Sequence, residues 1–240
     1  MIDFHTHVLP KLDDGSKSID ETTLMLKQIK AQNISTVIAT PHFYANKISV
    51  DDFLKARNES VESLAVRLKN RGELLDMSLF LGAEVAYYDN ISENENLEKL
   101  CIEGTKTLLL ELSYKPVDCY VLSEIANISI RGITPVIAHC ERYLKFKNSI
   151  EMFGRLIACG AKIQVNSDFF IGRLTKNKAM KLLKSNQIHV LGSDCHNMKK
   201  RKPNLDLAVK EIAKKRLSFA INQVNLNANE LLEGAKVINL

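Results

Sequence analysis

Short runs of β-branched and other apolar residues alternate along the chain with longer segments in which apolar residues recur at helical spacing. Runs of the first kind predict strands, and segments of the second kind predict amphipathic helices. Strands are expected at residues 2–7, 35–40, 78–85, 107–112, 133–138, 161–166 and 188–193. Several of these runs are apolar at nearly every position, which is typical of parallel strands covered by helices on both faces.

The segments between the strands carry helix start and stop signals. Ser18 and Glu21 fit a capping box that opens a helix reaching about Gln32. Gly132 and Gly160 stand where a left-handed glycine often ends a helix. Further helices are expected at 50–71, 117–131, 149–159, 175–186 and 204–215, with one or two short helices after residue 216.

The spacing of these elements indicates one fold over the whole chain. One strand follows another every 25–45 residues or so, roughly one β/α unit each. Because the 240 residues contain nothing that resembles a linker or a repeat, we expect a single domain over 1–240. Seven units predict a closed or nearly closed parallel α/β barrel, and a doubly wound open sheet is the alternative.

Composition and charge exclude several classes of protein. The chain is 45% hydrophobic and 25% charged, as globular proteins are, and its net charge of +5 permits an anionic ligand without demanding nucleic acid. No secretory signal is visible, and no apolar stretch approaches the roughly 20 residues of a membrane helix. Five cysteines without a CxxC pair favour reduced thiols. We therefore expect a cytoplasmic protein without membrane insertion or bound nucleic acid.

Histidines and acids gather where the predicted strands end. The set comprises His5, His7, His42, Glu84, Glu111, His139, Asp194 and His196. Parallel barrels build their sites at the carboxyl ends of their strands, so these side chains are expected on one face. His5 and His7 are two residues apart on a strand and therefore point the same way. A carboxylate in the apolar run around Glu111 would be costly to bury unless it were paired or bound to a metal.

This mixture of imidazole and carboxylate donors suits Mn²⁺, Fe²⁺, Co²⁺ or Zn²⁺ better than Ca²⁺. The donors are too many for one ion, so two or three neighbouring ions are expected, able to activate water and neutralise a phosphoryl group. Each residue also has a plainer interpretation, because single strand histidines are usually structural and Asp13-Asp14-Gly15 resembles a turn. The set as a whole favours a metal site, and only His189 is expected to be structural.

Seven motifs occur in order along nearly the whole chain: MIDFHTHVLPKLDDGSKS, IATPHF, LGAEVAYY, LLLELS, GITPVIAHCERY, IQVNS and VLGSDCHN. Together they resemble the PHP (polymerase and histidinol phosphatase) superfamily. Within it, they are similar to the bacterial manganese-dependent protein-tyrosine phosphatases of capsule and exopolysaccharide operons. The resemblance implies the PHP fold, a distorted (β/α)₇ TIM-like barrel with three metals in a cleft. It implies Mn²⁺ first, with Fe, Co, Mg or Zn as alternatives.

The resemblance also implies roles for individual residues. One metal would be held by His5, His7, Glu84 and Asp194, a second by Glu84, Glu111 and His139, and a third by Asp14, His42 and His196. Two substrate-binding arginines of the family correspond to Arg142 and Arg201. The implied substrate is phosphotyrosine in the tail of a partner bacterial tyrosine kinase. The implied mechanism is attack by a hydroxide that bridges the metals.

Other interpretations stay open at this point. Cys195 and Arg201 fit the Cys-x5-Arg signature of cysteine-dependent tyrosine phosphatases, but the loop between them has no glycine to cradle phosphate. Cys140 and Cys195 are expected to pack rather than to react. Histidinol phosphate, another small phosphomonoester or a nucleic acid could be cleaved at the same metal site. An amidohydrolase would usually have a bridging lysine, and a non-enzymatic module would lack ligands that this chain has.

Overall fold

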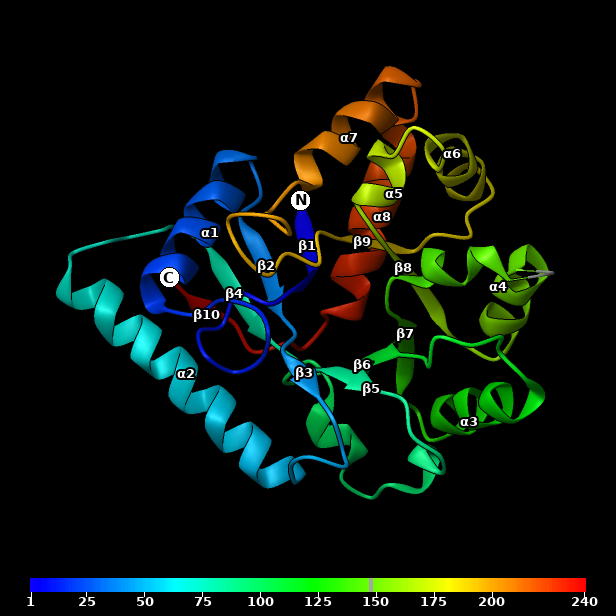
Figure 1. Ribbon diagram of the computed structural model, residues 1–240, viewed down its shortest axis with the longest axis horizontal. Coiled ribbons are helices and arrows are strands. Elements are labelled where there is room, and N and C mark those ends of the chain that lie inside the picture. The colour runs from blue at the N-terminus through cyan, green and yellow to red at the C-terminus, as the bar shows by residue number, and fades with distance from the viewer. Residues whose placement is uncertain (147–148) are drawn as a thin grey trace.

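Helices surround a central set of strands (Figure 1), and the computed structural model describes residues 1–146 and 149–240. The strands are β1 (Ile2–Thr6), β2 (Thr36–Ala39), β3 (His42–Phe43), β4 (Ser78–Leu81), β5 (Glu84–Ala86), β6 (Thr107–Glu111), β7 (Thr134–Ile137), β8 (Lys162–Asn166), β9 (Val190–Gly192) and β10 (Ile238–Asn239). The α-helices are α1 (Ile19–Ala31), α2 (Val50–Asn70), α3 (Cys119–Ile130), α4 (Ser149–Ala158), α5 (Asp168–Ile171), α6 (Lys176–Lys184), α7 (Leu205–Lys214) and α8 (Ser218–Leu231).

The strands form a curled and mostly parallel sheet. One part has the order β1-β2-β4-β10 and the other the order β3-β5-β6-β7-β8-β9, and of these pairs only β10 with β4 is antiparallel. A parallel bridge between Thr6 and Cys195 brings the segment after β9 back to β1. The predicted mixed α/β fold with a parallel barrel-like sheet is therefore confirmed, and the open doubly wound alternative is not adopted.

All seven predicted strands are present, and one of them is divided. The run expected at 78–85 breaks into β4 and β5, and β2 likewise continues into β3 past Pro41, which has no amide proton for the ladder. Hydrogen bonds from Gly82 to Ala39 and from Glu84 to Pro41 carry the pairing through this bend. The strands β3 and β10, each two residues long, are too short to have been predicted from alternation.

The helices begin and end close to the expected residues. The Ser18 side chain accepts a hydrogen bond from the Glu21 amide and caps α1, as predicted. Gly132 and Gly160 adopt φ of +78° and +90° after α3 and α4, the left-handed conformation expected of them. The short helix α5 was not predicted. Among the described residues, no helix is long and apolar enough to cross a membrane.

Buried apolar side chains hold the helices on the strands. The larger cluster joins the strands to the surrounding helices, and a smaller one links β1, β2, β6, β7 and β9 to the C-terminal end of α8. The Thr107 hydroxyl at the start of β6 donates a hydrogen bond to the Leu231 carbonyl of α8. With α8 packed at the starts of the strands, the carboxyl ends are left for the loops that carry the polar residues.

Candidate metal centre

Three imidazoles, from β1, the residue just after β1, and β3, surround one carboxylate oxygen. Glu84, the first residue of β5, places its Oε2 atom 3.2 Å from Nε2 of His5 and 3.2 Å from Nε2 of His7. Nδ1 of His42 lies 3.0 Å from the same oxygen. His5, His7 and Glu84 are fully buried. The sequence prediction that these side chains converge at the strand ends is thus met in the structure.

The remaining predicted donors complete the cluster. His139 Nε2 is 2.7 Å from Glu84 Oε1 and 3.2 Å from Glu111 Oε1, so the Glu84 carboxylate lies between His139 and the other three histidines. Asp194 Oδ1 is 3.6 Å from His5 Nε2 and 3.5 Å from His7 Nε2. The acid inside the apolar run of β6 is therefore not isolated, because Glu111 is paired with a histidine.

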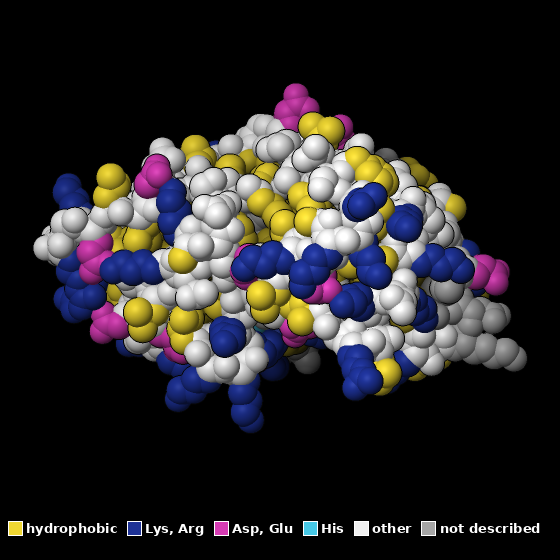
Figure 2. Space-filling model, turned by 90° about the horizontal axis from the view of Figure 1, so that it is seen from above, with side chains coloured by type: hydrophobic (Ala, Val, Ile, Leu, Met, Phe, Trp, Pro, Cys, Tyr) yellow, Lys and Arg dark blue, Asp and Glu magenta, His cyan; other side chains and the backbone are white. Residues whose placement is uncertain are grey.

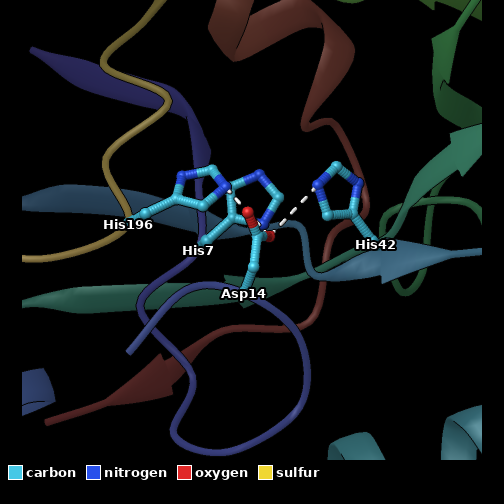
Figure 3. A group of neighbouring side chains, drawn as sticks. All are labelled: His7, Asp14, His42 and His196. Carbon is cyan, nitrogen blue, oxygen red and sulfur yellow. Dashed lines mark ion pairs between the residues drawn. The ribbon is translucent and has the colours of Figure 1, made fainter. Parts of the chain in front are cut away.

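Asp14 reaches into the cluster from the loop that follows β1 (Figure 3). Its Oδ1 atom lies between His42 Nε2 at 3.5 Å and His196 Nε2 at 3.3 Å, and the ring of His7 lies 3.8 Å from that of His196. Asp14 is 63% exposed, in contrast to the buried histidines around it. The aspartate that resembled a turn residue thus faces the site.

The orientation of the rings is what metal ions require. The Nδ1 atoms of His5, His7 and His196 each lie within hydrogen-bond distance of an oxygen, namely that of Gln164 at 3.2 Å, of Asp13 at 2.6 Å and of the Asp194 carbonyl at 2.9 Å. If Nδ1 donates in each case, Nε2 is left with a lone pair that faces the cluster. The buried atoms Glu84 Oε2, His42 Nδ1 and His196 Nε2 have no hydrogen-bond partner among the described residues. Nitrogen and oxygen lone pairs that face one another in this way fit divalent cations.

Three groups of donors are compact enough to hold an ion each. They are His5, His7 and Glu84; His42, Glu84 and Glu111; and His7, Asp14, His42 and His196, with the donor atoms of each group within 4.8 Å of one another. Glu84 is shared between two groups, as the resemblance implied. The partition differs in detail, since His42 joins Glu84 and Glu111, and His7 joins Asp14.

The electrostatics of the cluster reflect its burial and its charges. Burial alone would raise the pKa of Glu84, but the charge of His5 and the hydrogen bond with His139 outweigh it and hold the pKa well below its usual range. Burial would lower the pKa of His7, yet its hydrogen bonds to Asp13 and Asp194 raise it well above the ordinary value. The cluster thus strongly favours positive charge at its centre.

Two site residues have an unusual backbone. His139 lies two residues after the end of β7, and Asp194 lies two residues after the end of β9. They adopt positive φ values of 31° and 52°, respectively. Such left-handed residues other than glycine cost on the order of 1–3 kcal/mol and cluster at functional sites. Close packing adds to the constraint, because a Cβ atom at Gly192 would lie 2.5 Å from Cβ of His5. The side chains are therefore positioned by the ends of the strands.

The two predicted arginines meet over the cluster. Arg142 Nη2 is 3.0 Å from Oδ2 of Asp194, and Arg201 Nη2 is 2.7 Å from Oδ1 of the same carboxylate. Arg142 also contacts Glu111 at 3.3 Å. Both guanidinium groups are more than one third exposed, so they can be approached from solvent. Two such guanidinium forks have the geometry that binds an oxyanion through two parallel hydrogen bonds.

Sequence reasoning missed three residues that orient the donors. Asp13 was considered only as part of a turn, but its Oδ2 atom accepts hydrogen bonds from His7 and from the backbone amide of His42. Gln164 Oε1 accepts from the backbone amide of His139 at 2.6 Å. The Asn166 side chain donates to Asp194 at 2.8 Å. For Gln164 and Asn166 the signal was present in β8, where polar residues alternate with apolar ones and two of them are amides.

The segment that carries Arg201 is basic. Residues 173–216 include thirteen Lys and Arg and only three Asp and Glu, so the net positive charge of this segment exceeds the +5 of the whole chain. It comprises α6, β9, α7 and the loop that carries Arg201. Figure 2 shows Lys and Arg side chains spread as a band across one face of the molecule. This charge favours the approach of an anionic substrate.

Comparison with known proteins relates this site to a family. The family described as capsular polysaccharide synthesis, CpsB/CapC, matches residues 1–233. The chain is 31% identical to the putative tyrosine-protein phosphatase CapC of Staphylococcus aureus over 84% of this chain and 79% of that protein. It is also 31% identical to the tyrosine-protein phosphatase CpsB of Streptococcus pneumoniae over 90% of each.

A solved structure agrees with these relatives. Crystal structures of YwqE from Bacillus subtilis and CpsB from Streptococcus pneumoniae, described as unique metal-dependent tyrosine phosphatases, match with a TM-score of 0.83 and 26% identity over 100% of this chain and 97% of that chain. A probable 2-pyrone-4,6-dicarboxylic acid hydrolase from Acinetobacter baumannii, at 14% identity and a TM-score of 0.58, shares the fold alone. By the extent of these matches, the chain belongs to the CpsB/CapC family of capsular polysaccharide synthesis.

Proposed function

We propose that this protein is a metal-dependent protein-tyrosine phosphatase that acts on the phosphotyrosine-bearing tail of a bacterial tyrosine kinase and so regulates capsular or exopolysaccharide synthesis. The observation that carries the proposal is the convergence of histidine Nε2 lone pairs and shared carboxylates between two arginines, in a chain similar to tyrosine phosphatases along nearly its whole length. The proposal treats residues 1–240 as one catalytic domain. Five free cysteines support a cytoplasmic location.

The donors suit two or three ions, with Mn²⁺ proposed first and Fe, Co, Mg or Zn as alternatives. The ligands would be His5, His7, Asp14, His42, Glu84, Glu111, His139, Asp194 and His196, all of which lie in the cluster or at its edge. When bound, such ions lower the pKa of water and offset charge on a phosphoryl group. Asp13 and Gln164 would keep the histidine rings aligned.

Arg142 and Arg201 would bind the phosphate oxygens. Their guanidinium groups would exchange some of their contacts with Asp194 for hydrogen bonds to the non-bridging phosphate oxygens. Negative charge accumulates on these oxygens during phosphoryl transfer. Their forks would also hold the phosphate in line with the attacking water. No protein side chain needs to act as a nucleophile, and the phenolate of tyrosine would be the leaving group.

The cysteine-dependent alternative lacks support from Cys195. Its side chain is fully buried, and burial raises the pKa of its thiol. A nucleophilic cysteine needs access and a lowered pKa, and Cys195 has neither. The position of Arg201 near Asp14 and Asp194 is instead explained by the metal cluster.

The test is hydrolysis of a phosphotyrosyl peptide by the purified protein, with histidinol phosphate as the competing substrate. We expect turnover that EDTA abolishes and added Mn²⁺ restores, with a preference for the phosphotyrosyl peptide. Cys195→Ser should remain active. Activity that survives chelation but is lost in Cys195→Ser would refute the metal mechanism, and a preference for histidinol phosphate would refute the assigned substrate.

A further inference from the structure

A pocket of about 490 Å³ opens directly beside the metal cluster. One end is lined by Glu111, His139 and Arg142, which belong to the site described above. The rest of the lining, called the aromatic end below, is mostly aromatic and apolar and consists of Tyr87, Leu112, Tyr114 and Tyr143 with Ala86 and the small polar Ser113. Its volume lies within the usual range for small-molecule sites. A ligand whose anionic group is bound by Arg142 would therefore extend into the aromatic end of the pocket.

The walls of this pocket come from three neighbouring strand ends. Ala86 and Tyr87 lie at the end of β5, residues 111–114 at the end of β6, and Arg142 and Tyr143 in the 3-10 helix η3 (Cys140–Lys145) after β7. Tyr143 is buried, and its hydroxyl donates to the Leu112 carbonyl, which ties η3 to the end of β6. The aromatic end is thus joined to the strands that position the donors.

Tyr114 forms the outer wall and is held from outside. The Lys145 ammonium lies 3.4 Å from the centroid of the Tyr114 ring, and the Phe146 ring meets it edge-on at 5.9 Å. Neither Lys145 nor Phe146 lines the pocket, so both contacts lie on the side of the Tyr114 ring away from Arg142's pocket lining. Tyr114 is 63% exposed, which leaves much of its ring available to a ligand.

We propose that this aromatic end binds the phenyl ring of phosphotyrosine, and that Tyr114 makes the enzyme prefer aryl over alkyl phosphate monoesters. The inference rests on the proposed phosphatase function and adds the residue that selects the substrate. Phosphate bound by Arg142 would place the ester oxygen at the mouth of the pocket, where a phenyl ring can contact Tyr114 in a stacked or edge-on arrangement. A phosphoserine side chain has no ring to fill this space, and its peptide would have to enter the pocket instead.

The experiment measures kcat and KM of the metal-loaded protein on a phosphotyrosyl peptide and on the phosphoseryl peptide of the same sequence. In Tyr114→Ala we expect kcat/KM to fall about threefold to tenfold for the phosphotyrosyl peptide, mainly through KM, with little change for the phosphoseryl peptide. Tyr114→Phe keeps the ring and should restore the wild-type preference. Tyr120→Ala is the matched control, because Tyr120 is 44% exposed, bonds to Asn90 and does not line the pocket.

A binding measurement separates failure of this inference from failure of the proposed function. Phenylphosphonate and methylphosphonate, which cannot be hydrolysed, are titrated calorimetrically into the metal-loaded wild-type protein and Tyr114→Ala. We expect the phenyl compound to bind more tightly to the wild type, and this preference to shrink threefold to tenfold in the variant. An equal loss for both phosphonates, or an unchanged preference, overturns the inference. A wild-type protein that fails to cleave phosphotyrosine refutes the function, whatever the titration gives.

Discussion

The metal cluster has two parts that differ in burial. Its floor consists of His5, His7, Glu84, His139 and His196, and all five side chains are at most 2% exposed. Its rim consists of Asp14, Arg142 and Arg201, which are 63%, 37% and 40% exposed. The floor residues lie on strands or within four residues after a strand ends, whereas Asp14 and Arg201 lie in longer loops and Arg142 lies in η3.

The difference assigns separate tasks to the two parts. Floor side chains are buried and fixed by hydrogen bonds on the far side of the ring, so they are suited to hold ions at constant positions. Moving a rim side chain costs less free energy, because water can solvate its charge while it exchanges one anionic partner for another. Floor substitutions should therefore remove metal, and substitutions of the two rim arginines should weaken the substrate interaction and leave metal in place. Asp14 is the rim residue that would also hold an ion.

The largest effect is expected from Glu84→Gln, which removes the charge shared by two donor groups in the floor. Loss of a residue that only supports a ligand typically costs tenfold to a hundredfold in metal affinity. A shared ligand should cost more, so we expect kcat/KM on a phosphotyrosyl peptide to fall at least a hundredfold. Metal content, measured by mass spectrometry after gel filtration, should fall with it.

Glu124→Gln is the matched control for a buried glutamate. Glu124 is 5% exposed and accepts hydrogen bonds from the Ser92 amide and hydroxyl, outside the cluster. This variant should lose stability but keep its metal and its activity per folded molecule. If Glu84→Gln retained the full metal content, the floor would not be the ion-binding part and the comparison would fail.

An intermediate effect is expected in the rim from Arg201→Lys. Lysine keeps the charge but loses the fork that can bind two phosphate oxygens, and a hydrogen bond between charged groups is worth about 1.5–3 kcal/mol. The kcat/KM value should therefore fall about tenfold to a hundredfold, while metal content stays at the wild-type level. Steady-state kinetics and metal analysis on the same preparation measure both quantities.

Arg131→Lys provides the control for this change. Its guanidinium group bonds to the backbone carbonyls of Ser92 and Asn94, away from the metal cluster. Its activity should match the wild type. Loss of metal in Arg201→Lys would mean that the rim arginines are also needed to hold the ions, and the division of tasks between floor and arginines would have to be abandoned.

The alternation of apolar runs and helical segments predicted most of the fold, because buried parallel strands are apolar on both faces. The bend at Pro41 and Gly82 escaped prediction, since it depends on pairing between segments about forty residues apart in sequence rather than on either segment alone. The two-residue strands β3 and β10 are defined only by their partners β5 and β4. Strand pairing of this kind produces no pattern of hydrophobic and polar residues in the local sequence.

The floor was easier to predict than the residues that support it. A histidine or an acid at the end of an apolar strand is conspicuous, and all of the expected donors lie within the cluster or at its edge. Asp13 and Gln164 are ordinary residues of turns and strands until the fold brings them to His7 and His5. The metal partition likewise depends on distances across strands, which sequence spacing does not contain.

The smallest effect is expected outside the cluster, at the one histidine predicted to be structural. His189 Nδ1 accepts a hydrogen bond from the Ile163 amide, so the ring must be neutral, and burial together with the charge of Lys162 lowers its pKa to about 4. In the unfolded chain the pKa has its ordinary value near 6.5, so below that pH the unfolded state binds the proton first. Stability should therefore decline as pH falls from about 6.5 to about 4.

The measurement is denaturant unfolding of the wild type and of His189→Asn in EDTA at about pH 7 and about pH 5. Asparagine retains an acceptor close to the Nδ1 position but does not titrate. The wild type should lose about 2 kcal/mol more unfolding free energy over this interval than the variant. Because the other five histidines are common to both proteins, the difference isolates His189. Kinetics with added Mn²⁺ at about pH 7 should be the same in both. A variant with lowered metal affinity would instead connect the sixth histidine to the floor.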